Sequence, residues 1–286
     1  MSAFLSYLVH GVIVGCGFAL LASGLILIYR VTRVVNLAQG MFAVVAGFLA
    51  ASLLDAGLPH GLSELLAILV AAAVGTCTGY VALGRRGTSP QASLIATLGV
   101  GIFAYALEIL IWGDQPRSFS GLNGALELGE VSVPWQYVLI VAVTLATFAA
   151  LEGFLERTDW GKALSACASN PYAAGLVGIG VKRMGLLGFT LGGGLGGICG
   201  VLLTPLRPIS YDSDVLLFVN GFSAAILAGM KRPVLALVGG VALGVAEAFV
   251  AGYAKASYQS SLALLLALGI LIAQAYRRPT LHAAEH

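Results

Sequence analysis

The sequence has few charged side chains. Asp, Glu, Lys and Arg together make up 10% of the residues, against about 25% in an ordinary soluble domain. Hydrophobic residues make up 59%. A surface of this composition is not compatible with water, so a soluble globular protein is excluded. The net charge of +2 is close to neutral and gives no support for nucleic-acid binding.

Motifs for catalysis, nucleotide binding and metal binding are also missing. The sole Gly-Lys pair, Gly161 and Lys162, is followed by Ala163, whereas a phosphate-binding loop needs Ser or Thr there to bind Mg²⁺. There is no HExxH sequence, and the four cysteines lack metal-ligand spacing. We therefore expect no enzymatic activity and no cofactor bound by this chain. Energy for uphill transport would come from an ion gradient or from another subunit.

The sequence contains instead a series of apolar segments, each about as long as a membrane-spanning helix. These segments cover residues 6–28, 34–54, 62–83, 91–111, 134–152, 184–204, 215–230, 234–252 and 257–275. They predict an all-α polytopic transmembrane bundle of about eight or nine spans, with residues 1–286 as a single transmembrane domain.

Positive charge alternates between the ends of these segments. Twelve of the 15 Lys and Arg fall on one side: Arg30, Arg33, Arg85, Arg86, Arg157, Lys162, Lys182, Arg183, Lys231, Arg232, Arg277 and Arg278. The other side carries Arg117, Arg207, Lys255 and seven acids: Asp55, Glu64, Asp114, Glu127, Glu130, Asp212 and Asp214. Basic short loops mark the cytoplasm. The N-terminus is therefore predicted outside and the C-terminus inside.

The connection over residues 153–183, which the charge pattern places in the cytoplasm, is too polar to span a membrane. It is also too apolar for a linker that only lies in solvent. Apolar residues over 163–167 have helical spacing, and Asn170 followed by Pro171 is typical of a helix start. A short amphipathic turn over 172–177 is then ended by glycine. Two short helices of this kind fit a groove of a partner protein. They also fit a connector on lipid headgroups, and spacing alone does not separate the two interpretations.

Glycine recurs every four residues in the sixth apolar segment, at Gly188, Gly192, Gly196 and Gly200. One face of this helix is therefore almost bare backbone, which permits close approach of another helix. We interpret the face as a packing surface in preference to a substrate site. The spacing repeats more weakly at Gly11 and Gly15, and at Gly240 and Gly244.

Polar groups inside apolar segments are the candidates for a substrate pathway. They are Asn36, Gln39, Asn220, Ser223 and Glu247. Amide-bearing, interrupted segments in both halves of a transporter point to its pathway, and an intramembrane acid is a functional candidate by default. The alternative is hydrogen bonding between helices. For Glu247, and more strongly for Glu108, snorkelling to the outer interface or pairing with Lys255 or Arg117 is the favoured alternative.

Three stretches resemble a known family. They are NLAQG from Asn36, the run GKALSACASNPYAAGLVGIGVKRMGLLGFTLGGGLGGICGVLL over 161–203, and LVGGVALGVAEAF over 237–249. Together they are similar to the inner-membrane permease of branched-chain amino acid type ABC importers, the LivH/LivM group. The resemblance implies ATPase coupling through Lys162, Asn170, Pro171, Tyr172, Ala173, Ala174 and Gly178. It also implies a bacterial inner-membrane location.

The resemblance further implies the partners of the chain. These are a second, LivM-like permease subunit, two LivG/LivF-like cytoplasmic ATPase subunits that bind ATP, and an extracytoplasmic solute-binding protein. Relatives are associated with branched-chain amino acids, urea, short amides and aromatic acids. The chain departs from the family at Gln39, Gly40 and Met41, where a histidine, a glycine and an acid are usual, and this puts the substrate in question.

Two other classes of function are compatible with the residues alone. One is a self-sufficient ion-coupled secondary transporter or channel, which needs an ion site among Glu108, Glu247 and the amides. The other is a membrane scaffold that transports nothing.

Overall fold

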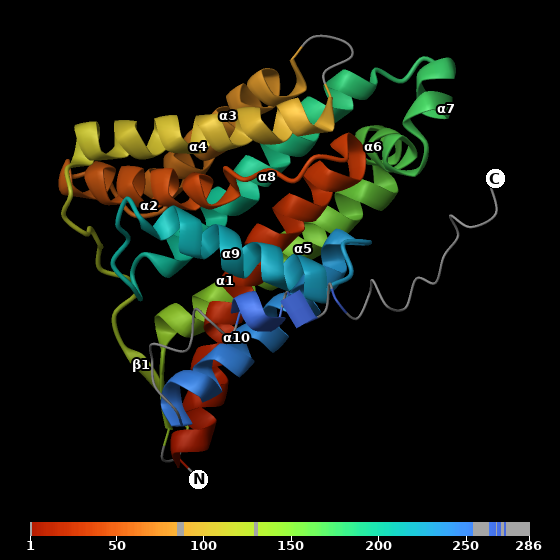
Figure 1. Cartoon of the computed structure of the whole chain (residues 1–286). Helices are drawn as coiled ribbons and strands as arrows, with labels where there is room; N and C mark the ends of the chain where they lie inside the picture. Colours follow the sequence, from red (N-terminus) through yellow and green to blue (C-terminus); the bar gives the residue numbers. More distant parts are fainter. Residues whose placement is uncertain are drawn as a thin grey trace.

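The computed structural model describes residues 2–84, 89–128, 131–253, 263–266, 268–269 and 272. The chain folds as a bundle of helices (Figure 1), so the predicted all-α class is confirmed. The helices are α1 Ser2–Thr32, α2 Gln39–Asp55, α3 Leu62–Leu83, α4 Pro90–Trp112, α5 Trp135–Arg157, α6 Asp159–Ser169, α7 Pro171–Leu176, α8 Val181–Leu203, α9 Ser213–Leu227 and α10 Ala236–Tyr253, the last preceded by a 3₁₀ turn, Pro233–Leu235.

Six helices in the described part of the chain are long and apolar enough to cross a membrane, namely α1, α3, α4, α5, α8 and α10 with its 3₁₀ turn. Two predicted segments form shorter apolar helices: α2 has 17 residues and α9 has 15. The ninth predicted segment, 257–275, lies mostly outside the described residues.

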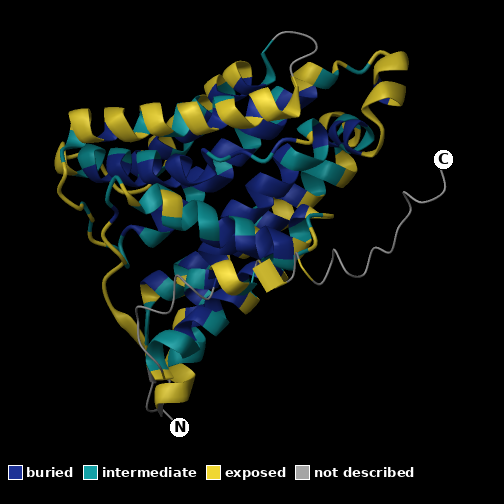
Figure 2. Cartoon of the chain, viewed as in Figure 1, coloured by how far each residue is buried: buried dark blue, intermediate teal, exposed yellow. Residues whose placement is uncertain are grey.

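The bundle is organised around α1 and α8, whose apolar parts are largely buried. Helix α4 is the opposite case, since nearly its whole length is exposed in Figure 2. Its exposed side chains are large and apolar, including Ile102, Phe103 and Leu110. Such a surface is stable against lipid chains and not against water. The three buried polar residues of α4, which are Ser93, Thr97 and Glu108, face the bundle interior.

Glycines allow the central helices to touch backbone to backbone. Between α1 and α10, a Cβ atom on Gly15 would lie 2.7 Å from the carbonyl oxygen of Gly240, and one on Gly244 would overlap the carbonyl oxygen of Gly11. The two weaker glycine repeats in the sequence therefore pack against each other in one helix–helix contact, between α1 and α10. Close approach of this kind gains dispersion contacts that larger side chains would prevent.

The glycine face of α8 lies against α1 and α2. A Cβ atom on Gly192 would lie 2.7 Å from Cδ1 of Ile28, and one on Gly196 would lie 2.8 Å from Cβ of Phe42. At Gly200 it would overlap the carbonyl oxygen of Ala43. Gly188 is less confined, because the nearest atom to its Cβ position is the carbonyl oxygen of Leu27 at 3.7 Å.

The long connection between α4 and α5 contains a β-hairpin. Strand β1, Ala125–Leu128, pairs antiparallel with β2, Val131–Pro134. The same connection is joined to the chain after α8 by two backbone hydrogen bonds between Arg117 and Ile209, at 2.9 and 2.8 Å. The bonds hold the two connections together at one end of the bundle.

Candidate functional site

Helix α2 starts inside the bundle and not at its edge. The prediction of one apolar helix over 34–54 is wrong at its start, because residues 34–36 are non-helical and α2 begins at Gln39. The Gln39 side chain donates a 2.9 Å hydrogen bond to the carbonyl oxygen of Gly192. Gly192 lies 11 residues into α8, which is about 16 Å along that helix at about 1.5 Å per residue. The first turn of α2 therefore lies near mid-bundle.

The start of α9 meets the start of α2. A Cβ atom on Gly40 would overlap the carbonyl oxygen of Asp214, in the first turn of α9. After α8, residues 204–212 thus lead the chain back into the bundle before α9 begins (Figure 1). Helix starts present unpaired backbone N–H groups, and discontinuous helices that meet inside a bundle are typical of substrate sites in transporters.

Two of the five predicted pathway residues, Asn36 and Gln39, form hydrogen bonds that hold the start of α2. The Asn36 side chain is fully buried, donates a 3.2 Å hydrogen bond to Oε1 of Gln39, and accepts one from the backbone N–H of Ala38. Gln39, also fully buried, continues the chain of bonds to α8. A third, Ser223, donates to the carbonyl oxygen of Ala263 at 3.0 Å. None of these three lines the main cavity.

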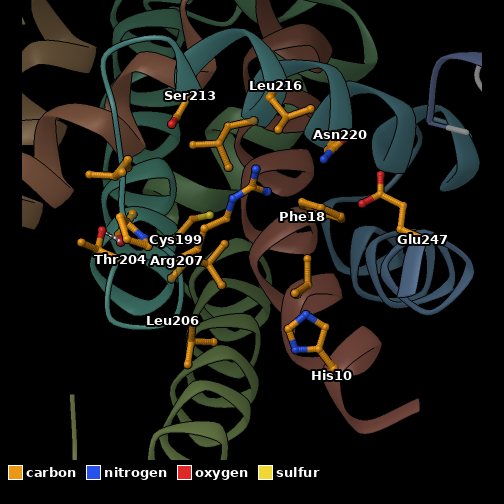
Figure 3. A pocket seen from close by; sticks show the side chains of 16 residues that line it. His10, Phe18, Cys199, Thr204, Leu206, Arg207, Ser213, Leu216, Asn220 and Glu247 are labelled. Atoms are coloured by element: carbon orange, nitrogen blue, oxygen red, sulfur yellow. Dashed lines mark hydrogen bonds between the residues drawn. The ribbon is translucent and has the colours of Figure 1, made fainter. Parts of the chain in front are cut away.

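The main cavity, of about 500 Å³, does contain the other two predicted residues, Asn220 and Glu247 (Figure 3). It lies between α1, α8, α9 and α10 and the connection after α8. His10 and Arg207 are exposed, whereas Asn220 is 4% and Glu247 is 1% exposed. The walls are mostly apolar, with Val14, Phe18, Leu203, Leu206, Leu216 and Leu217. The cavity therefore combines two exposed basic side chains with a buried amide and a buried acid.

Sequence reasoning missed Arg207 and Phe18 as lining residues. Arg207 appeared in the sequence as one cation of an external loop, and nothing in the pattern showed that residues 204–212 return into the bundle. Phe18 lies in a uniformly apolar helix, where no periodicity separates a cavity wall from a packing face. Asn220 and Glu247 were found because polar groups are conspicuous in apolar segments.

Glu108 does not behave as the sequence suggested. Its side chain is 1% exposed, and neither carboxylate oxygen has a hydrogen-bond partner among the described residues. Arg117 pairs instead with Asp55, at 3.8 Å, and Lys255 lies outside the described residues. Snorkelling and pairing with Arg117 are therefore both wrong for Glu108. The residue does not line the main cavity.

The connection over residues 153–183 contains two short helices, α6 and α7, and the second ends in an exposed apolar surface. Asn170 caps α7 by accepting a 3.0 Å hydrogen bond from the N–H of Ala173, and Pro171 is the first residue of that helix, so the predicted helix start is confirmed. Helix α7 projects from the bundle (Figure 1). The side chains of Tyr172 and Leu176 in α7, and of Val177 directly after it, are 77%, 72% and 77% exposed. We call these three residues the α7 patch.

The neighbouring positions of this segment differ in exposure. Lys162 and Ala173 are exposed, while Ala174 is 4% exposed and packs against the chain's own core. Gly178 follows α7 with φ +88°, a conformation that favours glycine. The α7 patch is therefore presented outward on a helix whose opposite side is held by Ala174.

Helix α6 is bonded to the end of α1. The Arg33 guanidinium donates a 3.0 Å hydrogen bond to the carbonyl oxygen of Ala168, near the end of α6. Three residues later the chain reaches Asn36, which holds the start of α2. Arg33 therefore connects α6 to the segment that leads to the start of α2.

Within the described ranges, no group of three or more His, Cys, Asp or Glu side chains could hold a metal ion.

Comparisons with known proteins agree with this arrangement. A family model described as "Branched-chain amino acid transport system / permease component" matches residues 7–274. The chain is 28% identical to the LivH branched-chain amino acid permease of Salmonella typhimurium, over 94% of this chain and 93% of that protein. It is 28% identical to the BraD permease of Pseudomonas aeruginosa, over 97% and 94%. It is 31% identical to a probable LivH permease of Methanocaldococcus jannaschii, over 84% and 78%.

A solved structure, PsaBC from Streptococcus pneumoniae in complex with Fab, has a related fold. The TM-score is 0.53 at 15% identity, covering 96% of this chain and 92% of that chain. At this identity the likeness concerns the fold alone.

Proposed function

This chain belongs to the family of permease components of branched-chain amino acid ABC transporters, and we propose that it imports branched-chain amino acids as one of two membrane subunits of an ATP-driven complex. The observation that carries the proposal is the α7 patch, an exposed apolar surface on a capped helix that projects from the bundle. A surface of this kind suits a groove on a partner protein. It is linked to the start of α2 through α6 and Arg33.

The sequence has no phosphate-binding loop, so ATP is assigned to partner subunits and not to this chain. An ATPase and a solute-binding protein follow from the importer family. In the finer assignment, LivG/LivF-like subunits dock on the α7 patch, a LivM-like subunit is the second permease, and the solute-binding protein delivers substrate at the opposite end. The coupling role of Lys162, Asn170, Ala173 and Gly178 is part of this proposal.

The substrate assignment follows the names of the relatives. The departure from the family at Gln39 does not argue against it, because the Gln39 side chain is bonded to Gly192 and does not line the main cavity. ATP-dependent uptake of labelled leucine by the complete reconstituted complex tests the assignment. Valine and isoleucine should compete with leucine and urea should not. Efficient competition by urea, with none by valine, would assign a different substrate.

The protein is a multi-pass membrane protein of the inner membrane, with the N-terminus proposed outside and α6 and α7 proposed in the cytoplasm. Two contacts support this orientation. Arg33 is bonded to α6, and Lys182 donates to the carbonyl oxygen of Gly84, so basic residues from several connections gather at the α6–α7 end. The pair of Asp55 and Arg117 lies with the α4–α5 connection instead.

Cysteine labelling tests the orientation. In a chain whose only native cysteine is Cys167, a Ser120→Cys change should react with a membrane-impermeant maleimide added to sealed cells, and Ser169→Cys should react only after the cells are opened. Both positions are exposed. Cys167 serves as an internal control: it is fully buried and burial raises the pKa of its thiol, so little thiolate forms and it should label slowly. Reaction of both introduced cysteines in sealed cells would refute the orientation.

A further inference from the structure

Three arginines gather at the C-terminal end of α1. Arg30 lies in the last turn of that helix, and Arg33 directly follows it. Arg232 comes from the connection between α9 and α10, just before the 3₁₀ turn Pro233–Leu235, which packs against both α1 and α10. The positive charges of Arg33 and Arg232 both act on the guanidinium of Arg30. We call Arg30, Arg33 and Arg232 the basic cluster.

The described residues provide no anion to neutralise the basic cluster. The ion pairs that they form lie elsewhere in the chain. Arg33 donates a hydrogen bond to the carbonyl oxygen of Ala168, whereas Arg30 is half-buried and pairs with no described carboxylate. Like charges that are close together and partly shielded from water repel one another strongly. The cluster is therefore suited to an anion from outside the described chain, and its exposed members Arg33 and Arg232 leave it accessible.

The backbone at the basic cluster has an unfavourable conformation. In the described ranges, the non-glycine residues with positive φ are Arg33, at 59°, and Met230, at 51°. Left-handed backbone brings Cβ too close to the following carbonyl oxygen. Met230 directly precedes Lys231 and Arg232. Both outliers thus lie where the chain presents its basic side chains, and strain of this kind is concentrated at functional sites.

The surface that follows the basic cluster is apolar. Leu235 is 44% exposed and Val238 is 67% exposed, and both belong to the stretch Pro233–Tyr253 that is apolar enough to cross a membrane. Arg30 is at the end of another such stretch. A cation at the end of a spanning helix lies at the depth of the lipid headgroups, and apolar side chains one or two turns farther along contact the acyl chains.

We propose that the basic cluster binds the phosphate of an anionic phospholipid, whose acyl chains lie along the exposed start of α10. A guanidinium can hold a phosphate through two parallel hydrogen bonds, and basic pockets between spanning helices suit anionic headgroups. The bound lipid offsets the repulsion between the arginines and so stabilises the contact of α1 with the turn before α10. The inference goes beyond the proposed function and does not depend on which solute is transported.

A free phosphate ion and an acidic surface of a partner protein could also pair with arginine. The lipid is favoured by the position of Arg30, which is half-buried in a spanning helix, so that a headgroup in the membrane reaches it more directly than a protein surface outside. The apolar side chains of Leu235 and Val238 favour a ligand with acyl chains over a free ion.

The test measures the unfolding midpoint of the purified permease–ATPase complex in detergent as dioleoyl phosphatidylglycerol is added. Dioleoyl phosphatidylcholine, which has the same chains and no net charge, and inorganic phosphate are the comparison ligands. The wild-type midpoint should rise saturably with phosphatidylglycerol and should change little with the other two. Arg30→Gln and Arg232→Gln should each raise the lipid concentration for half of the effect by about tenfold or more, because a charge-assisted hydrogen bond to the phosphate is lost.

Three further variants separate lipid binding from misfolding. Arg183→Gln removes an exposed arginine in the first turn of α8, outside the basic cluster, and should respond to lipid as the wild type does. Arg30→Lys and Arg232→Lys keep the charge and should retain more of the response than the Gln variants. Arg33 is not a target, because its substitution would also break the bond to Ala168. Native mass spectrometry of the same complexes counts the phosphatidylglycerol molecules that each variant retains, and the two Gln variants should retain fewer.

Several results would overturn the proposal. They are a wild-type lipid response in both Gln variants, an equal loss in Arg183→Gln, and equal stabilisation by phosphatidylcholine. A response to inorganic phosphate as large as that to phosphatidylglycerol would identify a site for a free ion instead. Loss of the co-purifying ATPase from both Gln variants, with an unchanged lipid response, would assign the basic cluster to the partner protein. None of these results would alter the assignment of the chain as an importer subunit, which uptake measurements test separately.

Discussion

The Gly200→Ala variant should give a several-fold lower yield of assembled complex and a lower unfolding temperature, whereas Gly194→Ala should be at least as stable as the wild type. A methyl group on Gly200 would overlap the carbonyl oxygen of Ala43, so the backbones of α8 and α2 would have to separate. Overpacking of this kind costs about 1–3 kcal/mol and sometimes more. On Gly194 the nearest atom would be Cβ of Ala72, at 3.8 Å, which is an ordinary contact.

The two variants form a matched pair because they lie on the same helix and make the same chemical change. Both gain the higher helix propensity of alanine, about 1 kcal/mol, so propensity cannot account for a difference between them. Yield after solubilisation and the thermal unfolding midpoint are the measurements. Equal yields and equal midpoints would show that α8 and α2 are free to separate and that the glycine face does not fix their spacing.

The second large effect concerns the α7 patch. Replacing Leu176 and Val177 together by Asp should reduce ATP-dependent uptake by about tenfold or more, because two charges would be desolvated in an apolar groove of the ATPase. The membrane bundle should still fold, since both side chains are largely exposed. Ala174 is not a suitable target, because it is buried and a charge there would disturb α7 itself.

An apolar double variant at the same two positions provides the control. Leu176→Met with Val177→Ile keeps the surface apolar and should retain uptake. The comparison is made on purified complexes, by the amount of ATPase that co-purifies and by the uptake rate. If the charged variant retains the ATPase and normal uptake, then α7 is a connector on the lipid headgroups and the ATPase docks elsewhere.

The sequence was sufficient to predict the features that depend on local chemistry. Long apolar segments predicted the spanning helices. Asn170 and Pro171 predicted the start of α7, because helix capping involves neighbouring residues only. The sequence indicated an interruption near the start of α2, but it did not show that the helix begins at Gln39. Leu37 and Ala38 are as apolar as the helix that follows, and the bond that fixes its start joins Gln39 to Gly192, 153 positions away in the chain.

The cavity depended on contacts that no local pattern encodes. Asn220 and Glu247 stand out as polar groups in apolar segments, but Arg207 lines the same cavity only because residues 204–212 fold back into the bundle. Glu108 lies near the C-terminal end of α4, as snorkelling to the outer interface requires, but the side chain points into the bundle, so the inference of snorkelling failed. Depth along a helix can be estimated from sequence, whereas the direction of one side chain depends on how the helices pack.

The contact between Arg33 and α6 would give the proposed coupling of ATPase and permease a physical route. Its hydrogen bond to Ala168 lies between the α7 patch and the start of α2. From there Asn36 and Gln39 lead to Gly192 on the glycine face of α8. Motion at the α6–α7 end is therefore expected to alter the meeting point of α2 and α9. Helix α9 also contributes Asn220 to the cavity.

The measurement that tests the central claim most directly is leucine uptake into proteoliposomes with and without the ATPase subunits. The account predicts ATP-dependent accumulation by the complete complex, none when the ATPase is omitted, and neither binding nor hydrolysis of ATP by the purified chain alone. Sustained leucine accumulation by this chain alone, driven by a proton or sodium gradient, would contradict it and identify the protein as an ion-coupled transporter.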